Sequence, residues 1–229
     1  MIHTRDLIKR YKTDNYSTDA LININIDINK EEFVAVAGPA GSGKTTLFNI
    51  LGLMVKPDSG EVWFLDKKTS NLWDKELTNL RKGKISYIFR HFNLIDELTV
   101  YQNIELPLIY LKYKKKERKE ALSQILKKLK IEHKKEMFPN QLTGLQQQIT
   151  CIARAVVTKP SLILADDPAG NLNSEGGREI LELLTDVNED GHTVVLFTSS
   201  AAEAEKARRV IQLFDGHVVT DAKKDNFII

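Results

Sequence analysis

The stretch "GPAGSGKTT", from Gly38 to Thr46, decides the fold of this chain. It fits the pattern G-x-x-x-x-G-K-[ST] and lies between an apolar run typical of a buried strand, "EEFVAVAG", and a segment with helical spacing, "KTTLFNILGLM". Glycines let backbone N–H groups turn inward around phosphate oxygens, and the amino end of the following helix adds positive potential. A chance glycine-rich turn does not account for the strand and the helix on its two sides. The stretch therefore predicts a phosphate-binding loop for a nucleoside triphosphate.

Two side chains of this loop have specific expected roles. Lys44 is expected to reach the β- and γ-phosphates, and Thr45 to place its hydroxyl on Mg²⁺. The other residues are expected to surround the phosphates with their backbone. The predicted nucleotide cradle comprises Gly38, Ala40, Gly41, Ser42, Gly43, Lys44, Thr45 and Thr46.

Strand and helix patterns alternate on both sides of the loop. The segment "ALININIDIN", residues 20–29, alternates apolar and polar residues, which is typical of a half-buried antiparallel strand. Further strands are predicted at "GEVWFLDKK", "KISYIFR", "SLILADD", "TVVLFTS" and "RVIQLFDGHVV", and helices at "TGLQQQITCIARAVV" and "EGGREILELLTDVNE". The chain from Thr99 to about Met137 also has a helical pattern. This order predicts an α/β fold with a mainly parallel sheet, interrupted by a helical lobe between Thr99 and Thr158.

Composition limits the classes of function. The formal net charge of the 229 residues is +2, which is too small to indicate a nucleic-acid partner. A single cysteine, Cys151, excludes an internal disulfide and fits a reducing compartment. The amino-terminal residues are polar without a signal-peptide pattern, and no apolar run approaches the roughly eighteen residues of a membrane helix. We therefore expect a cytoplasmic protein whose connection to a membrane goes through a partner.

A lysine-rich stretch, "KYKKKERKEALSQILKKLK", lies within the helical region. Lysines at this density can contact acidic lipid headgroups beside a membrane partner. The alternative is a solvated helix face, and the glutamates among the lysines favour this alternative. The two tryptophans, Trp63 and Trp73, are expected to be packing residues.

Four further motifs follow the phosphate loop in a fixed order. They are "FRHFNLIDELTVYQNIELPL", "NQLTGLQQQITCIARAVV", "LILADDPAGNLNS" and "VVLFTSS". This series resembles the ATP-binding subunit of ABC transporters from end to end, and the pattern "FNL…LT…NIELPL" is most similar to the branch of macrolide export, lipoprotein release and the cell-division ATPase. The resemblance implies one ABC ATPase domain over residues 1–229. A P-loop NTPase core of RecA-like type, with an antiparallel β subdomain, would cover residues 1–98 and 159–229, and a helical lobe residues 99–158.

The resemblance also implies partners and binding residues. Two such subunits, identical or different, dimerise head to tail around two ATP molecules and serve a transmembrane permease on the inner face of the cell membrane. Tyr11 matches the aromatic residue that stacks on adenine, and Asp166 matches the aspartate that holds Mg²⁺ together with Thr45. The signature of the opposite subunit, which also contacts the nucleotide, is matched by Thr143, Gly144 and Gln146.

Several catalytic positions depart from the family pattern. Asp167 replaces the glutamate base, Ser199 the histidine after the strand, and Arg90 the glutamine that reaches Mg²⁺ and the attacking water. A carboxylate retracted by roughly 1 Å can lower a rate about 10²-fold. Arg90 is expected either to pair with a strand-end carboxylate, replacing part of the charge of the metal, or to extend into solvent. Three further departures are Leu145 for the second signature glycine, Ile149 for an arginine, and Asn173 for an aspartate.

These departures lead to one main hypothesis and two alternatives. The main hypothesis is an ATP-binding subunit that hydrolyses ATP weakly or not at all. The first alternative is a working transport ATPase with a divergent site, in which Asp167 acts as base through a longer water bridge. The second is a nucleotide-dependent soluble scaffold without a transporter.

Overall fold

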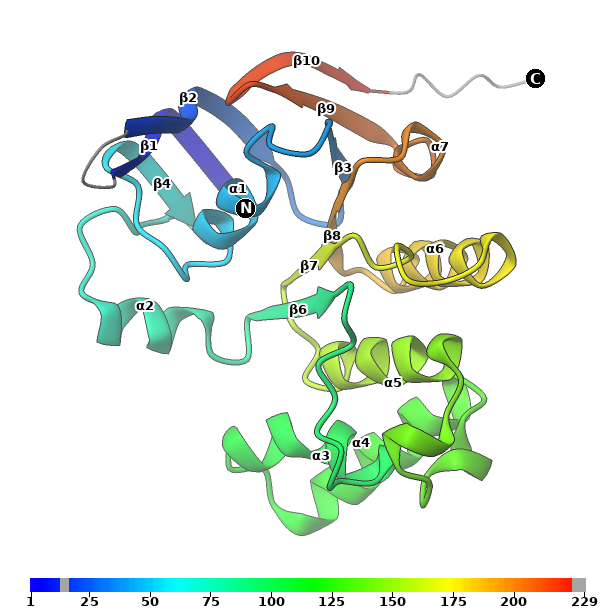
Figure 1. Cartoon of the computed structure of the whole chain (residues 1–229). Coiled ribbons are helices and arrows are strands. Elements are labelled where there is room, and N and C mark those ends of the chain that lie inside the picture. The colour runs from blue at the N-terminus through cyan, green and yellow to red at the C-terminus, as the bar shows by residue number, and fades with distance from the viewer. Residues whose placement is uncertain (13–16, 224–229) are drawn as a thin grey trace.

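Two β-sheets organise the chain, whose computed structural model describes residues 1–12 and 17–223 (Figure 1). The smaller sheet is antiparallel and has the strand order β2-β1-β4-β5. Its strands are β1 (Ile2–Lys12), β2 (Ser17–Ile28), β4 (Ser59–Phe64) and β5 (Lys67–Lys68). Most of residues 20–29 lie in β2 and pair antiparallel with β1, so the prediction for this segment is confirmed.

The amino-terminal segment forms β1, a strand that its polar sequence did not predict. Its apolar side chains Ile2 and Leu7 are only 1% and 0% exposed. They pair with Ile28 and Ile24 of β2. The long-range pairing, rather than the local pattern, therefore determines this strand, as is common for β structure.

The larger sheet is mixed and has six strands in the order β10-β9-β3-β8-β7-β6. Its members from β9 to β6 are mutually parallel, and β10 is antiparallel to β9. The strands are β3 (Phe33–Ala37), β6 (Ile85–Phe89), β7 (Leu162–Asp166), β8 (Thr193–Thr198), β9 (Arg209–Phe214) and β10 (His217–Lys223). The carboxyl ends of β3, β8, β7 and β6 therefore meet at one edge, which is where sheets of this kind bind ligands.

Helices cover both faces of the larger sheet. The helix α1 (Lys44–Leu51) packs on one face, in the same core cluster as Val34 and Leu162. The helices α5 (Gly144–Val156) and α6 (Ser174–Glu189) pack on the other face, with Ala35 and Ile163. Neighbouring strand residues point to opposite faces, so a strand covered on both sides is apolar throughout, as predicted for β3. The short helix α7 (Ala201–Ala204) follows β8.

The region from Thr99 to Met137 is divided into short helices. They are α3 (Val100–Tyr110), α4 (Lys115–Lys128) and the 3-10 turn η1 (Glu132–Lys134); a second 3-10 turn, η2 (Pro139–Gln141), precedes α5. Thr99 caps α3, because its hydroxyl accepts a hydrogen bond from the backbone N–H of Gln102 at 3.3 Å. Lys112 has a φ of 61°, and a left-handed residue does not continue an α-helix.

The helix α2 (Asp74–Arg81) was not predicted, and the residue before it corrects an expectation. Trp73 is 78% exposed, so the prediction that it packs in the interior is wrong. Trp63 is half-buried on β4, and the ammonium group of Lys68 lies 5.5 Å from the centroid of its ring.

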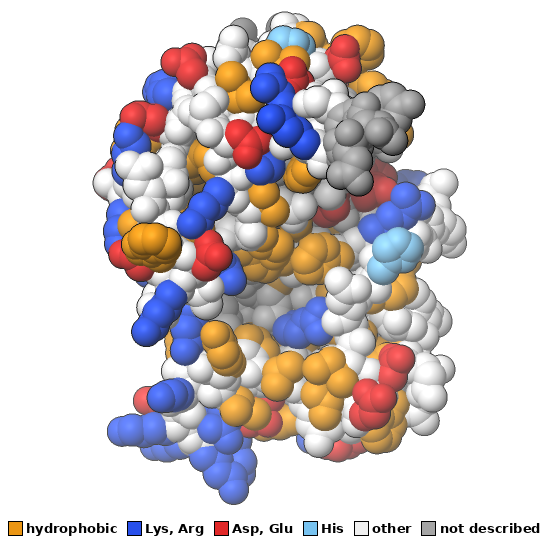
Figure 2. Space-filling view, turned by 60° about the vertical axis from the view of Figure 1, so that its left-hand side comes forward, with side chains coloured by type: hydrophobic (Ala, Val, Ile, Leu, Met, Phe, Trp, Pro, Cys, Tyr) orange, Lys and Arg blue, Asp and Glu red, His pale blue; other side chains and the backbone are white. Residues whose placement is uncertain are grey.

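Charge is unevenly distributed over the surface. Figure 2 shows Lys and Arg side chains gathered at the lower end of one face, at the level where Figure 1 places α3 and α4. Over residues 1–12 and 17–223, each helix is too short or too polar to span a lipid bilayer.

Candidate functional site

The phosphate loop lies between the carboxyl end of β3 and the first turn of α1. Gly41 and Gly43 have φ of 80° and 100°, a region that glycine adopts far more readily than other residues. A Cβ atom at Gly43 would overlap the carbonyl oxygen of Ala20 on β2, and one at Gly38 would overlap that of Leu213 on β9. The backbone turn therefore favours glycine at positions 41 and 43, and the close approach of neighbouring strands requires it at positions 38 and 43.

The interior of the loop fits a phosphate group. Ser42 is 3% exposed, and its Oγ has no hydrogen-bond partner within the described ranges. A buried hydroxyl without a partner is costly, so such a group indicates a ligand or water that completes it. Thr45, in the first turn of α1, is exposed and offers a second hydroxyl. Ala40 and Thr46 lie on the same loop and first turn, as predicted.

Lys44 is folded over its own loop. Its Nζ donates hydrogen bonds to the carbonyl oxygens of Gly38 at 2.7 Å and Pro39 at 2.8 Å. Burial lowers the pKa of the ammonium group, and the carboxylates of Asp166 and Asp167 oppose this shift. An ammonium group binds a negatively charged phosphate more strongly than a neutral carbonyl, so an incoming phosphate can displace these bonds.

Two carboxylates stand at the carboxyl end of β7. Burial raises the pKa of Asp166, the neighbouring charge of Asp167 adds to the rise, and Lys44 and Arg90 oppose it. Asp167 has a φ of 47°, and its backbone N–H donates to the carbonyl oxygen of Phe197 on β8 at 2.8 Å. The left-handed backbone of a non-glycine residue costs about 1–3 kcal/mol and is common at functional sites. Asp166 and Thr45 supply the oxygen donors that Mg²⁺ prefers.

Arg90 is held against Asp167 and the loop that follows it. Its Nη1 lies 3.1 Å from Oδ2 of Asp167. Its Nε donates to Oδ1 of Asn171 at 2.9 Å, and its Nη2 to the carbonyl oxygen of Gly170 at 3.1 Å. The side chain of Asn171 also donates to the carbonyl oxygen of Arg90 at 3.0 Å. Of the two expectations for Arg90, the structure shows pairing with a carboxylate, and that carboxylate is Asp167.

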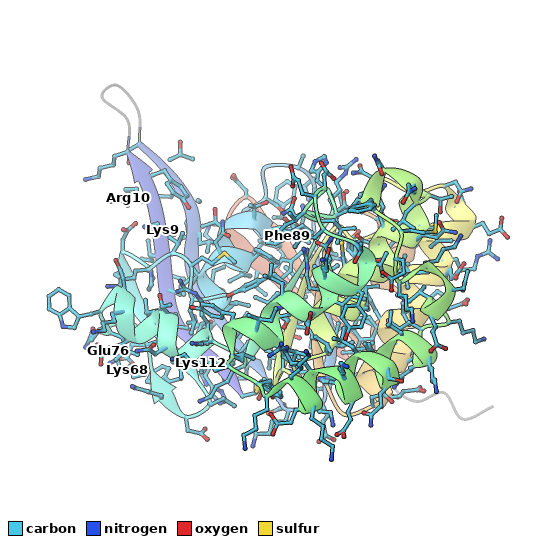
Figure 3. The ribbon with its side chains drawn as sticks, turned by 90° about the horizontal axis from the view of Figure 1, so that it is seen from below. Lys9, Arg10, Lys68, Glu76, Phe89 and Lys112 are labelled. Carbon is cyan, nitrogen blue, oxygen red and sulfur yellow. The ribbon has the colours of Figure 1, made fainter. Side chains whose placement is uncertain are left out.

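Gln148 is a member of this site that the sequence did not reveal. Its side chain is 0% exposed, and Nε2 donates to the carbonyl oxygens of Phe89 at 3.3 Å and Pro168 at 2.8 Å. Phe89 precedes Arg90, and Pro168 follows Asp167; Figure 3, seen from below, labels Phe89 near the centre of the molecule. Gln148 thus joins α5 to the two strand ends that carry the ion pair. A glutamine within the apolar face of a predicted helix was the available signal.

For two predicted site residues, the described part of the chain shows no contact that defines their role. Ser199 is exposed and follows β8, so it lies at the same sheet edge as Asp166. Tyr11 is 46% exposed on β1 and pairs with Thr18 of β2, two residues before the Ala20 that touches the loop. Their parts in catalysis and in adenine binding stay predictions.

The signature residues stand at the amino end of α5. The Thr143 hydroxyl accepts from the backbone N–H of Gln146 at 3.3 Å, and the Gln146 side chain accepts from the backbone N–H of Thr143 at 3.1 Å. Leu145 is half-buried and packs against the core cluster of this face. Because α5 and α1 lie on opposite faces of the sheet, the chain places the signature (Gly144 included) and the phosphate loop on separate surfaces.

Comparisons with known proteins identify relatives of this chain. A family model described as ABC transporter matches residues 21–170. The chain is 43% identical over 232 residues to the ABC transporter ATP-binding protein MJ0796 of Methanocaldococcus jannaschii, covering 99% of both proteins. It is 41% identical over 212 residues to the macrolide export ATP-binding/permease protein MacB of Campylobacter jejuni, covering 92% of this chain and 33% of that protein. The chain thus spans about a third of the length of MacB.

Solved structures agree with this relationship. A dimeric structure of the MJ0796 cassette in a post-hydrolysis state, bound to ADP and Pi, has a TM-score of 0.89 and 42% identity, with 99% of this chain and 100% of that one covered. A second dimeric structure of MJ0796 has a TM-score of 0.89 and 43% identity, at the same coverage. The expected fold, a RecA-like mixed sheet with an antiparallel β subdomain, is therefore confirmed. On this sequence and structural similarity, the chain belongs to the ABC transporter family as an ATP-binding domain.

Proposed function

We propose that the chain is an ATP-hydrolysing cassette of a membrane transport complex, and that its divergent site slows hydrolysis without abolishing it. One observation carries the proposal: Lys44 and the carboxylates of Asp166 and Asp167 interact electrostatically at the sheet edge that also holds the phosphate loop. This set provides a phosphate ligand, a metal ligand and a base. The relative MJ0796, solved in a post-hydrolysis state with ADP and Pi, supports hydrolysis over the weak or absent hydrolysis of our main expectation.

In the proposed mechanism, the loop residues bind the phosphates and the strand-end residues act on the attacking water. Lys44 exchanges its two carbonyl contacts for the β- and γ-phosphates. Thr45 and Asp166 would hold Mg²⁺, which when bound supplies positive charge to the phosphates. Asp167 accepts the proton of the attacking water once its carboxylate is free of Arg90.

ATP binding without hydrolysis is the second candidate, and one observation favours it. The guanidinium of Arg90 binds the Asp167 carboxylate and the adjacent turn through three separate contacts. A carboxylate that stays in contact with Arg90 is not free to accept a proton from the attacking water, so a persistent contact would stop the reaction after ATP binding.

The proposal extends to the assembly. Because the signature and the phosphate loop lie on separate surfaces, a second subunit, identical or different, has to complete each nucleotide site with its Thr143, Gly144 and Gln146. The MJ0796 structures are dimeric, and MacB is described as an ATP-binding/permease protein. Both support a dimer that serves a transmembrane permease. We place the subunit on the cytoplasmic side of the membrane, as one domain with a helical lobe at residues 99–158.

Steady-state ATP turnover by the purified chain, alone and with its permease, tests the proposal. Turnover that disappears in Asp167→Asn supports it, whereas ATP binding without turnover supports the second candidate. Calorimetric titration with ATP, with and without Mg²⁺, tests whether Arg90 replaces part of the charge of the metal, which binding without Mg²⁺ would support. Absence of binding at millimolar ATP would overturn both candidates, and a pull-down without a membrane subunit would favour the scaffold alternative.

A further inference from the structure

One surface beside the end of α3 combines exposed aromatic rings with lysines. Tyr110 is 59% exposed and Tyr113 is 38% exposed, and the lysines around them are exposed or half-buried. Figure 3 places Lys112 beside the end of α3, on the side toward α2. We call this the tyrosine–lysine surface, and it comprises Lys82, Tyr110, Lys112, Tyr113, Lys114, Lys115 and Lys116.

The backbone of the tyrosine–lysine surface is held in place. The backbone N–H of Tyr113 donates to the carbonyl oxygen of Leu108 at 3.0 Å. Arg118 donates to the carbonyl oxygen of Tyr113 at 2.9 Å and to the carboxylate of Glu105 at 2.8 Å. The turn between α3 and α4 therefore presents its lysines from a fixed position, so binding requires little further ordering of the backbone.

The lysines of this surface lack acidic partners. In the described part of the chain, the ion pairs made by lysines belong to Lys9, Lys56, Lys68, Lys128 and Lys223. The first acid after the lysines, Glu117, accepts a hydrogen bond from the backbone N–H of Lys114 at 2.7 Å, and Glu120 follows three residues later on α4. In the described ranges no ion pair joins the glutamates of α4 to these lysines, so close contacts do not neutralise the positive charge at this end of the lysine-rich stretch.

The tyrosines fit the same kind of ligand as the lysines. The ammonium group of Lys82 lies 4.3 Å from the centroid of the Tyr110 ring, which joins the segment before β6 to the end of α3. Tyrosine rings favour the level of the headgroups, where the ring is in apolar surroundings and the hydroxyl is hydrated. Lysine stems lie along apolar surface while the ammonium groups reach the phosphates.

We infer that the tyrosine–lysine surface binds the headgroup layer of an anionic lipid bilayer. Charge complementarity favours lipid as the ligand, because clusters of about four to eight basic residues bind acidic headgroups. Each lysine near the bilayer raises the partition coefficient roughly fivefold. The inference rests on the proposed position of the cassette beside a membrane. It does not depend on nucleotide, so its failure would leave the ATP-binding proposal unaffected.

Sedimentation with sucrose-loaded vesicles tests the inference, using the purified full-length chain without nucleotide. We expect binding to vesicles with 30% phosphatidylglycerol in phosphatidylcholine, little binding to phosphatidylcholine alone, and loss of binding at high salt. Replacing Lys114, Lys115 and Lys116 by Gln is expected to lower the partition coefficient roughly 100-fold. The matched control replaces exposed lysines beyond the middle of the same region, Lys127, Lys130 and Lys135, by Gln and is expected to change it less than about threefold.

Three results would overturn the inference. They are equal binding to neutral and anionic vesicles, equal effects of the two triple variants, and no binding to anionic vesicles. The last result would instead assign the basic surface to an acidic segment of a protein partner. All of the substituted lysines are solvent-accessible, so the variants are expected to fold, and a circular-dichroism melting curve checks this.

Discussion

Replacing Arg90 by Gln is expected to accelerate ATP hydrolysis. In the resting chain the guanidinium binds Asp167, Asn171 and the carbonyl oxygen of Gly170. If Asp167 has to leave Arg90 before it accepts a proton, the energy of these contacts adds to the barrier. A glutamine carries no charge, and it leaves the Asp167 carboxylate free to act.

The size of the effect follows from the geometry. The Arg90 side chain is 48% exposed and the Asp167 side chain 24% exposed, so solvent screens the ion pair, which contributes about 1 kcal/mol. The two further hydrogen bonds contribute roughly 1 kcal/mol each. Since about 1.4 kcal/mol corresponds to a factor of ten in rate, kcat is expected to rise between roughly fivefold, if only the ion pair breaks, and 100-fold. In the described ranges the hydrogen bonds and the ion pair of Arg90 do not reach the phosphate loop, so KM is expected to change less than about threefold.

Steady-state turnover of the wild-type chain and its variants, measured with the permease present, is the assay. Asn171→Ala, which removes one of the three contacts, is expected to raise kcat about fivefold. Asp167→Asn is expected to lower it more than about 100-fold in both backgrounds, because the base is lost. A lower kcat in Arg90→Gln, or a gain that survives Asp167→Asn, would refute the reasoning and make Arg90 a supporting residue of the reaction.

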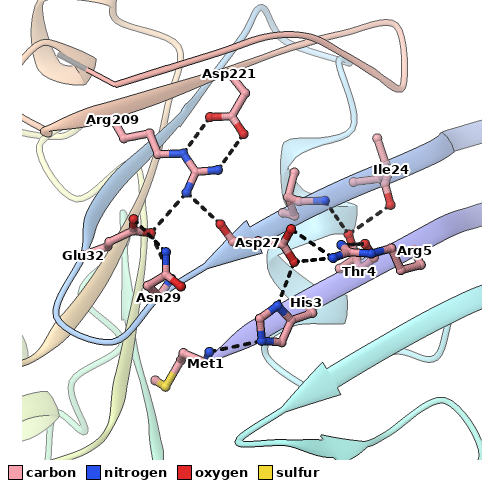
Figure 4. Close-up of polar contacts among 11 residues, drawn as sticks. Met1, His3, Thr4, Arg5, Ile24, Asp27, Asn29, Glu32, Arg209 and Asp221 are labelled. Carbon is pink, nitrogen blue, oxygen red and sulfur yellow. Dashed lines mark hydrogen bonds and ion pairs between the residues drawn. The ribbon is translucent and has the colours of Figure 1, made fainter. Parts of the chain in front are cut away.

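Three other predictions concern the loop and the stability of the fold. Lys44→Ala is expected to weaken ATP binding roughly 100-fold or more in calorimetry, and an unchanged affinity would remove the loop from the site. Gly43→Ala is expected to destabilise the chain by at least about 2 kcal/mol in urea unfolding, and the control Gly191→Ala by less. Both glycines have a positive φ, but a Cβ atom would overlap a backbone oxygen at Gly43 and would meet no atom within 4 Å at Gly191. Equal losses of stability would contradict this reasoning. Burial raises the pKa of Asp27, but the hydrogen bonds from His3 and Arg5 together outweigh burial, so the net shift is downward. Figure 4 shows these contacts. The folded-state pKa is thus below the unfolded value of about 3.9, so the stabilisation is present above that pH and is lost as the pH falls below it. Asp27→Asn should therefore flatten the dependence of the unfolding free energy on pH between about 4 and 2, and an unchanged slope would exclude this carboxylate as a cause.

Local patterns were sufficient for the phosphate loop and the strand ends. The loop pattern between a buried strand and a helix predicted the course of the chain around Lys44, and apolar runs predicted where Asp166 and Ser199 stand. These features depend on neighbouring residues, so the sequence carries them. The same approach missed β1 and α2, because the first is determined by pairing across the sheet and the second has a mostly polar sequence.

Other contacts between distant residues, for which no motif names a partner, could not be foreseen. Arg209 donates to the carbonyl oxygen of Asp27, 182 positions away, and joins β9 to the end of β2 (Figure 4). Gln148 reaches Phe89 across 59 positions and Pro168 across 20. The residues that neighbour Arg209 and Gln148 in the sequence do not indicate which distant residues they bind.

The sequence by itself determined that the chain has a phosphate loop, a two-carboxylate strand end and the motif order of an ABC ATP-binding domain, because each is a local pattern of residue types. Only the tertiary structure decided which carboxylate Arg90 binds. It also showed that the helices that follow the signature and the phosphate loop, α5 and α1, lie on opposite faces of one sheet, and that the lysines after α3 lack carboxylate partners within the described ranges. These outcomes depend on distances between segments that packing of the two sheets and their helices brings together, and no local pattern encodes such distances.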